Sequence, residues 1–401
     1  MLAGMDTAAS IHSRLEPIAL IRVAGLAPVV TFLRGIGAPV ERLLSSANLP
    51  TFILDDPEAL ISLRQGVRFM EESARANGID NLGLLAGRDT KIDALGVFGG
   101  LIRRSRTVHE ALHTAIRTMP AFNSGVRYRL THDGHRVRVR PEFVDGIDAH
   151  RQADEYCSML VLNVLRLAAG PRWRPDDVVF ETRRTGGSGD PQVLPDARLV
   201  FQQGESAVTF PQSLLSRTLA PVYAMRRIEY TDIEAWKASG PAGDFLGSVL
   251  QVIAALSSPD HPRIGVTADA IGMSVRALQR RLAEDGVSYG RLVAQACFAT
   301  AVHLLEHTDA SVLDIALDLG YSDHAHFTRA FRRWTGVAPR EFRRVNRRSH
   351  GTSPALCLGR RSPSAGSNLR PALRCLLAAR SMPMTTPDER NDELVLARAA
   401  K

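Results

Sequence analysis

Two copies of one short pattern lie in the C-terminal half of this 401-residue chain, and they constrain its fold more than any other feature. Residues 268–274 read ADAIGMS and residues 316–322 read ALDLGYS. Each copy has Ala, two variable residues, an aliphatic residue, Gly, an apolar residue and Ser, and each runs into a segment of helical periodicity. Two copies in matching context indicate a duplicated structural unit. Because a Gly and a helix-capping Ser separate two helical segments in each copy, we predict a duplicated helix-turn-helix.

The first predicted helix-turn-helix covers residues 266–286. Ser274 stands where a helix N-cap belongs, and Leu278 and Leu282 define the buried face of the helix that follows. Three polar side chains point away from that face: Arg276, Gln279 and Arg280. Arg forms two hydrogen bonds with guanine and Gln two with adenine, so these residues suit base reading in the DNA major groove. The alternative, an ordinary solvated helix face, is disfavoured because the turn recurs.

The second predicted helix-turn-helix covers residues 313–336 and has one extra residue in its turn. Phe327 and Phe331 take the places of the two leucines, so their rings face inward. The outward stripe and its flanks carry side chains that suit polar contacts with DNA: His324, His326, Thr328 and Arg329. Histidines two residues apart diverge on a helix, and no Cys or third His lies nearby, so we predict no metal site.

Basic residues gather at the end of this region, where they suit contact with DNA phosphates. We assign the following residues to the DNA backbone: Ser274, His326, Arg332, Arg333, Arg340, Arg343 and Arg344. The alternative is a generic basic C-terminus. The formal net charge of +8 adds little, because residues 351–401 carry eight Lys and Arg against four Asp and Glu, about half of the excess.

Residues 244–344 closely resemble the DNA-binding domain of the bacterial AraC/XylS transcription regulators. The strongest match is the run 315–344, which has the family's residues at the following positions: Ile315, Ala316, Gly320, Tyr321, Phe327, Phe331, Gly336, Pro339 and Phe342. The resemblance implies a seven-helix domain whose two helix-turn-helix units bind double-stranded promoter DNA asymmetrically. By position it places base reading on Arg276, Gln279, Arg280, His324, Thr328 and Arg329. Many relatives carry an arginine in the linker helix where this chain has Cys297-Phe298, so that polar contact is not expected here.

Residues 17–220 mix predicted helices with predicted strands. The clearest hairpin covers residues 126–139, where apolar and Arg residues alternate around an Asp133-Gly134 turn, so one face is apolar and the other cationic. A capping box at 107–110 predicts a helix start, and Ser62 is a second candidate cap. A long amphipathic helix is expected over residues 153–168.

This N-terminal region also resembles, more weakly, the helix-rich effector domain of regulators related to those of ornithine and arginine utilisation. Residues 25–27 (GLA) and 83–87 (GLLAG) and the later succession of strands and helices carry the resemblance. It implies a small-molecule effector, whose identity the sequence does not give, and dimerisation.

The chain is therefore expected to have an α+β effector domain followed by an all-α DNA-binding domain. The predicted segments are a flexible N-terminus (1–16), an effector-binding domain (17–220), a connector (221–243), the DNA-binding domain (244–346) and a disordered basic tail (347–401). A Ser-Gly-Pro break at 239–241 supports the connector, and poor periodicity with many Ser, Pro, Gly and Arg supports the tail.

Composition bounds the remaining choices. The four cysteines form no C-x-x-C pair, which disfavours a zinc ribbon or a disulfide framework and fits a reducing compartment. No apolar run reaches membrane-spanning length and no leader pattern opens the chain, so we expect a cytoplasmic protein with no membrane partner and no cofactor.

The leading hypothesis is a sequence-specific transcription regulator that is controlled by a small molecule and is not an enzyme. Its rival is a cysteine-based repair enzyme fused to a DNA-binding domain, with Cys157 as nucleophile. Cys157 lies in a segment typical of a buried helix face, and the common phosphate-binding, hydrolase and metallopeptidase motifs are absent. A third hypothesis is that the arginine-bearing hairpin or the tail docks RNA polymerase, a membrane or nonspecific DNA.

Overall fold

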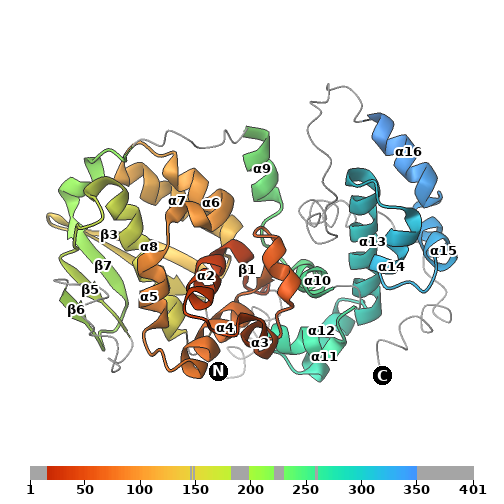
Figure 1. The fold of residues 1–401 in the computed structure, drawn as a ribbon, viewed down its shortest axis with the longest axis horizontal. Coiled ribbons are helices and arrows are strands. Elements are labelled where there is room, and N and C mark those ends of the chain that lie inside the picture. The colour runs from red at the N-terminus through yellow and green to blue at the C-terminus, as the bar shows by residue number, and fades with distance from the viewer. Residues whose placement is uncertain are drawn as a thin grey trace, which may run out of the picture. The chain divides into compact units, whose positions relative to one another are not determined.

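The computed structural model describes residues 16–144, 147, 150–181, 198–220, 230–257 and 261–349. The chain divides into two compact units, one over Ala19–Pro241 and the other containing Met1–Ile18 with Ala242–Lys401 (Figure 1). The first mixes helices and strands and the second is helical, which confirms the predicted fold class. Residues 1–15 of the predicted flexible N-terminus and residues 350–401 of the predicted tail lie outside the described residues.

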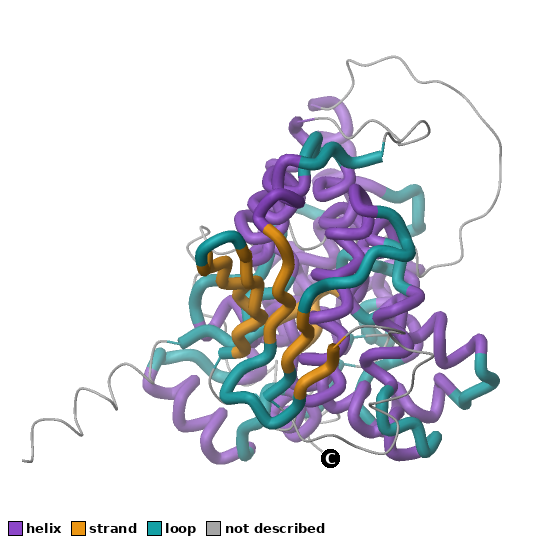
Figure 2. Tube along the Cα trace, turned by 90° about the vertical axis from the view of Figure 1, so that its left-hand side faces the viewer, coloured by secondary structure: helices purple, strands orange, loops and turns teal. Residues whose placement is uncertain are grey.

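The N-terminal unit packs helices against one five-stranded sheet. The strands are β3 (Val126–Asp133), β4 (Arg136–Phe143), β7 (Ala207–Pro211), β5 (Asp177–Val179) and β6 (Arg198–Val200), in that spatial order. Neighbours run antiparallel except β5 and β6, which are parallel. Figure 2 shows these strands side by side, with helices behind them. A separate two-stranded sheet pairs β1 (Leu20–Arg22) with β2 (Leu60–Ser62).

The helices of this unit supply most of its core. They are α2 (Ala27–Gly35), α3 (Val40–Ser46), α4 (Leu63–Ala76), α5 (Leu82–Asp89), α6 (Gly96–Arg103), α7 (Val108–Phe122), α8 (Arg151–Ala169) and α9 (Tyr230–Ala238). Helix α8 lies against the sheet, where Met159 and Leu162 join the same core as Val139 of β4 and Phe210 of β7. All four side chains are essentially inaccessible to solvent. The core therefore lies between the sheet and the helices that cover it.

The predicted hairpin is present, and its apolar face is confirmed. Val137 and Val139 are buried, and Gly134 has the positive φ of +57° that a tight turn needs. The other face is not simply cationic. Arg129 and Arg140 pair with Glu142, and Arg138 and Arg140 with Glu205 of the segment before β7. Because carboxylates neutralise this face, it offers little support for docking an acidic partner.

Two predicted caps differ from the structure in detail. The Thr107 hydroxyl accepts the Glu110 N–H, but the Glu110 carboxylate accepts from the N–H of Arg106, so the capping box is not reciprocal. Ser62 occupies the N-cap position of α4 without a capping hydrogen bond from its side chain.

The segment predicted as a connector contains helix α9, which belongs to the N-terminal unit. Trp236 of α9 is buried in the main core, and its indole N–H donates to the Glu58 carboxylate at 2.6 Å. The Trp236 carbonyl accepts from the buried guanidinium of Arg22 at 2.7 Å, and the Trp236 ring lies under that guanidinium. A lone tryptophan in a short polar helix gives no periodic signal, which is why the sequence does not reveal α9.

The C-terminal unit has seven helices among its described residues. They are α10 (Phe245–Leu256), α11 (Ile264–Ala270), α12 (Val275–Glu284), α13 (Tyr289–His307), α14 (Val312–Asp318), α15 (His324–Thr335) and α16 (Pro339–Ser349). Helix α13 contacts α10 on one side of the unit and α14 and α16 on the other. It therefore links the two helix-turn-helix units.

Candidate functional site

The two predicted helix-turn-helix units are formed by α11 with α12 and by α14 with α15. Their turns have the same backbone geometry, because Gly272 and Gly320 both adopt the left-handed conformation, with φ of +73° and +75°. A side chain at either position would be strained in that conformation. The repeated glycine of the sequence pattern is thus the residue that reverses the chain in each unit.

Helix α12 presents the polar face that the sequence predicts. Leu278 and Leu282 are buried, and the Ser274 hydroxyl caps the helix by accepting the Ala277 N–H at 3.1 Å. Arg276, Gln279 and Arg280 are all exposed. The next residue, Arg281, is committed elsewhere in this unit: its guanidinium lies 3.8 Å from the Phe245 ring centroid and donates to the Glu16 carbonyl at 3.0 Å. Arg276, Gln279 and Arg280 therefore form the exposed polar face of α12, and Arg281 is not part of it.

Helix α15 is anchored by aromatic rings. Phe327 and Phe331 are fully buried, and Phe331 packs against the rings of Phe298 and Phe342. The polar residues that were predicted to face outward remain accessible: His324, His326 and Arg329 are exposed and Thr328 is half-buried.

The cap of α15 is Asp323, not the serine of the repeated pattern. Its carboxylate accepts the backbone N–H groups of Ala325 and His326, each at 2.8 Å. These N–H bonds, with His326 and Arg329 nearby, hold the pKa of the Asp323 carboxyl below its usual range. Because the second turn has one extra residue, α15 is capped by the carboxylate of Asp323, whereas α12 is capped by the hydroxyl of Ser274.

The basic residues assigned to the DNA backbone fall into two groups. Arg332, Arg333, Arg340 and Arg344 are exposed. Arg343 is half-buried, and its guanidinium donates to the carbonyls of Leu305 at 3.2 Å and Ala310 at 2.7 Å. It thus satisfies carbonyls at the end of α13 and in the following loop. These bonds give Arg343 a structural role in this unit.

A groove brings predicted residues from different helices together. It lies at the starts of α14, α15 and α16, and its lining includes Val312, His324, Thr328 and Arg340. Two predicted base readers thus share one surface with a predicted phosphate contact. No group of three His, Cys, Asp or Glu side chains that could hold a metal ion occurs among the described residues.

The departure in the linker helix has a structural explanation. The Cys297 sulfur is buried 3.1 Å from His261 Nε2, and burial raises the pKa of the thiol to about 12. Phe298 packs on Phe331 and Trp334. Both residues serve the interior of the C-terminal unit.

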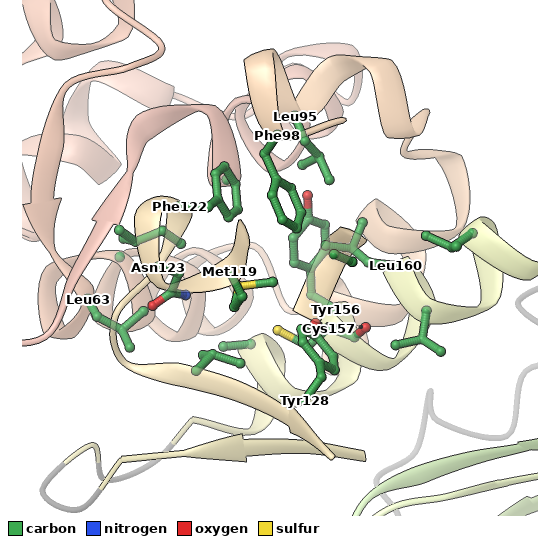
Figure 3. A pocket seen from close by; sticks show the side chains of 18 of the residues that line it. Leu63, Leu95, Phe98, Met119, Phe122, Asn123, Tyr128, Tyr156, Cys157 and Leu160 are labelled. Carbon is green, nitrogen blue, oxygen red and sulfur yellow. Dashed lines mark hydrogen bonds between the residues drawn. The ribbon is translucent and has the colours of Figure 1, made fainter. Parts of the chain in front are cut away.

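The N-terminal unit holds a cavity of about 80 Å³ between α4, α6, α7, α8 and the β3–β4 hairpin (Figure 3). Its walls are aliphatic and aromatic, with Leu95, Phe98, Met119, Phe122 and Leu160 among them. Among the described residues, the polar side chains in the lining are Asn123, Tyr128, Tyr156 and Cys157. The sequence predicts a ligand for this unit but none of these residues.

Cys157 is a poor nucleophile in this setting. Burial raises the pKa of its thiol to about 12, so almost none of it is thiolate near neutral pH. A reactive cysteine needs the opposite shift. The repair-enzyme hypothesis therefore finds no support at the residue on which it depends.

Comparison with known proteins matches both units to one class of regulator. Residues 37–219 match the family described as the arabinose-binding domain of the AraC transcription regulator, and residues 267–345 match a helix-turn-helix domain family. The chain belongs to the AraC-type transcription regulators. It is a sequence-specific DNA-binding regulator with an effector-binding N-terminal domain.

Two relatives match this AraC-type chain over nearly their whole lengths, and a third matches it over a short segment. VirS of Mycobacterium tuberculosis is 26% identical, with 82% of this chain and 98% of VirS covered. The ornithine utilization regulator of Pseudomonas aeruginosa is 22% identical, covering 81% of this chain and 96% of the relative. VqsM of the same organism is 42% identical over 88 residues, 22% of this chain and 27% of VqsM. These proteins are named as regulators.

No helix among the described residues combines the length and apolar character needed to cross a membrane.

Proposed function

We propose that this AraC-type regulator reads DNA bases with α12 and α15. The observation that carries the proposal is the outward polar face that follows each of two turns of the same geometry. The base-reading residues are Arg276, Gln279 and Arg280 on α12, and His324, Thr328 and Arg329 on α15. Each bidentate contact of this kind contributes about 1–3 kcal/mol of discrimination between bases.

The phosphate contacts are assigned to side chains that stay accessible around these faces. They are Ser274, His326, Arg332, Arg333, Arg340 and Arg344. Exposed guanidinium groups bind phosphates with little rearrangement, and each such contact makes the affinity more dependent on salt. Arg343 is excluded, because its donors already serve backbone carbonyls.

Selection from random DNA duplexes with the full chain tests the base-reading assignment. The selected duplex then serves in anisotropy titrations with Arg280→Ala, Arg329→Ala and the control Arg198→Ala, an exposed arginine of the N-terminal unit. We expect the first two variants to lose most of the preference for the selected duplex over random DNA, while the control keeps it. If both variants retain the wild-type preference, the assignment is wrong.

The apolar cavity is our proposed effector site. Apolar pockets with a few polar groups are the usual form of small-molecule sites, and this one lies within the unit matched to an effector-binding family. Effector binding then changes DNA affinity by the same factor by which DNA binding changes effector affinity. Titration of the selected duplex with and without effector shows whether the effector raises or lowers the affinity for DNA.

The proposal extends to location and partners. A protein that reads promoter DNA in a bacterium works in the cytoplasm. A second copy of the chain and RNA polymerase are the proposed protein partners. Sedimentation of the full chain, alone and with polymerase on the selected duplex, tests both, and a single monomeric species with no ternary complex would contradict them.

A further inference from the structure

We infer that the effector of this regulator is an uncharged, mainly hydrocarbon molecule with one hydrogen-bond acceptor that faces Asn123. The inference rests on the proposed assignment of the cavity as the effector site. It concerns the chemistry of the ligand, which neither the family match nor the relatives settle for this chain.

Among the residues that the structure describes, the lining of the cavity contains no charged side chain. A carboxylate or ammonium group moved from water into such surroundings loses hydration worth several kcal/mol, unless an opposite charge replaces it. A zwitterionic amino acid requires two such partners. The lining provides neither.

The nearest candidate counter-ion is already fully used. Arg22 follows the lining residue Ile21 and is inaccessible to solvent. Its Nε donates to the Ala121 carbonyl at 2.8 Å, and its two terminal nitrogens donate to backbone carbonyls and pair with the Glu58 carboxylate at 3.3 Å. A ligand carboxylate would have to break these bonds to reach it.

The two buried acids of α8 lie outside the lining and each has one polar partner, although the second Glu155 oxygen is buried without one. The Asp154 carboxylate accepts from the Ser206 hydroxyl, and Glu155 pairs with Arg151 at 3.4 Å. Neither acid lines the cavity, although Ala153, Tyr156 and Cys157 beside them do. A ligand ammonium group therefore finds no carboxylate here.

One polar group of the lining, the Asn123 amide, is held in a fixed orientation by the protein. Asn123 is only 5% exposed, and its Oδ1 accepts the Gly125 N–H at 2.9 Å. That bond turns Oδ1 toward Gly125, so Nδ2 lies on the opposite side of the amide. Figure 3 shows this nitrogen and the Cys157 sulfur directed toward the space beside Met119. The Nδ2 group is a hydrogen-bond donor, so a ligand carbonyl or ether oxygen placed beside it can accept a hydrogen bond from it.

The remaining polar groups cannot serve a sugar. Tyr128 donates its hydroxyl hydrogen to the Cys157 carbonyl in a long bond of 3.5 Å. The Tyr156 hydroxyl has no hydrogen bond of ordinary geometry among the described residues, although Thr90 lies close enough to influence its pKa. A pentose carries several hydroxyl groups, and each one left unpaired costs about 1–3 kcal/mol. A cavity with hydrocarbon walls and a few separate polar atoms therefore suits a ligand with one hydrogen-bond acceptor better than it suits a sugar.

The size of the cavity limits the ligand as well. A cavity of about 80 Å³ holds only a small molecule unless the walls move. Met70 and Met119, both in the lining, have flexible side chains that adjust to an incoming ligand. The space therefore suits a compact aromatic or short aliphatic compound.

Calorimetric titration of the full chain with a matched series of small compounds tests the inference. Acetophenone is uncharged with one acceptor, ethylbenzene lacks the acceptor, and benzoate and benzylammonium add a charge. L-Arabinose and L-ornithine represent sugars and amino acids. We expect acetophenone to bind about two- to tenfold more tightly than ethylbenzene, the equivalent of one net hydrogen bond. The charged compounds, the sugar and the amino acid should bind at least tenfold more weakly than acetophenone.

Two variants locate the binding. Leu160→Trp fills the cavity, whereas Leu167→Trp changes a partly buried residue of the same helix that packs on the core outside the lining. Acetophenone binding should disappear in the first variant and persist in the second, with unchanged circular dichroism in both. Stronger binding of a charged compound or of arabinose, lost in Leu160→Trp, overturns the ligand class but leaves the effector site in place. Acetophenone binding that survives Leu160→Trp, or no binding of any compound, overturns the effector site itself.

Discussion

The two helix-turn-helix units share a turn but differ in what anchors their recognition helices. In the first, Leu278 and Leu282 bury α12, and the neighbouring Arg281 lies on Phe245. In the second, the rings of Phe327 and Phe331 belong to an aromatic cluster that includes Phe298 of α13 and partly buried rings of α15 and α16. The duplicated sequence pattern therefore specifies the turn, whereas the side chains that bury the recognition helix differ between the two units.

This difference extends to the faces that meet DNA. The α12 face carries two arginines and a glutamine that are all exposed, whereas α15 offers Thr328, which is half-buried, between histidines and arginines. Long side chains with several donors suit base reading, and a short side chain in a basic rim suits contact with the backbone. We expect the stronger sequence preference at the half of the site that α12 meets.

The largest expected effect tests the anchors. Phe331→Ala removes a ring that packs on Phe298 and Phe342 and should lower the free energy of unfolding by about 3–5 kcal/mol. Leu282→Ala, its counterpart in the first unit, should cost less, since it removes a smaller buried side chain. Urea unfolding followed by circular dichroism measures both. An equal or larger loss for Leu282→Ala contradicts the idea that the second unit depends more on its core.

The next prediction separates structural from DNA-contacting arginines in the second unit. Arg343→Ala should lower the free energy of unfolding by about 1.5–3 kcal/mol, because two carbonyls lose a charged donor. Arg344→Ala should leave stability unchanged and reduce the slope of log affinity against log salt by about 1. Unfolding curves and salt titrations on the selected duplex report the two effects. A reversed outcome would return Arg343 to the DNA surface.

A smaller effect compares the two reading faces directly. Gln279→Ala should reduce discrimination at one base pair by about 1–3 kcal/mol, since it removes a bidentate donor and acceptor. Thr328→Ala should change discrimination less and affinity for all duplexes more evenly. Titration against every single-base change in the selected duplex measures this. Greater loss of discrimination with Thr328→Ala would reverse the expected asymmetry.

The smallest effect concerns the caps. Hydrogen bonds to backbone N–H groups lower the pKa of Asp323 in the folded state, whereas the Ser274 hydroxyl does not titrate in this range. A carboxyl whose folded-state pKa is depressed stabilises the protein fully above its unfolded pKa of about 3.9, and this stabilisation is lost as the pH falls through the folded pKa. Stability should therefore fall on acidification less steeply in Asp323→Asn than in the wild type. If the free energy of unfolding depends on pH in the same way in the wild type and in Asp323→Asn, the charge of the Asp323 cap does not contribute to stability.

Much of this arrangement could be predicted from short-range pattern. The turns, the buried pairs Leu278–Leu282 and Phe327–Phe331, and the β3–β4 hairpin all follow from periodicity and turn residues close together in the chain. Arg343 could not be predicted, because its acceptors, the carbonyls of Leu305 and Ala310, are distant in sequence and carry no side-chain signal. The role of Asn123 could not be predicted either, because the residues that line the cavity around it come from several helices and three strands.

The burial of Arg22 has a consequence for how the N-terminal unit is made. Its guanidinium is near the start of the chain, but two of its hydrogen-bond acceptors, Trp236 and Ser239, lie more than two hundred residues later. During synthesis on the ribosome, this charge has no complete set of partners until α9 has left the exit tunnel. The unit therefore reaches its final packing late in translation, and a chain that stops near residue 220 leaves a buried charge partly unpaired. Dissection of this regulator into separately produced domains should cut after Pro241.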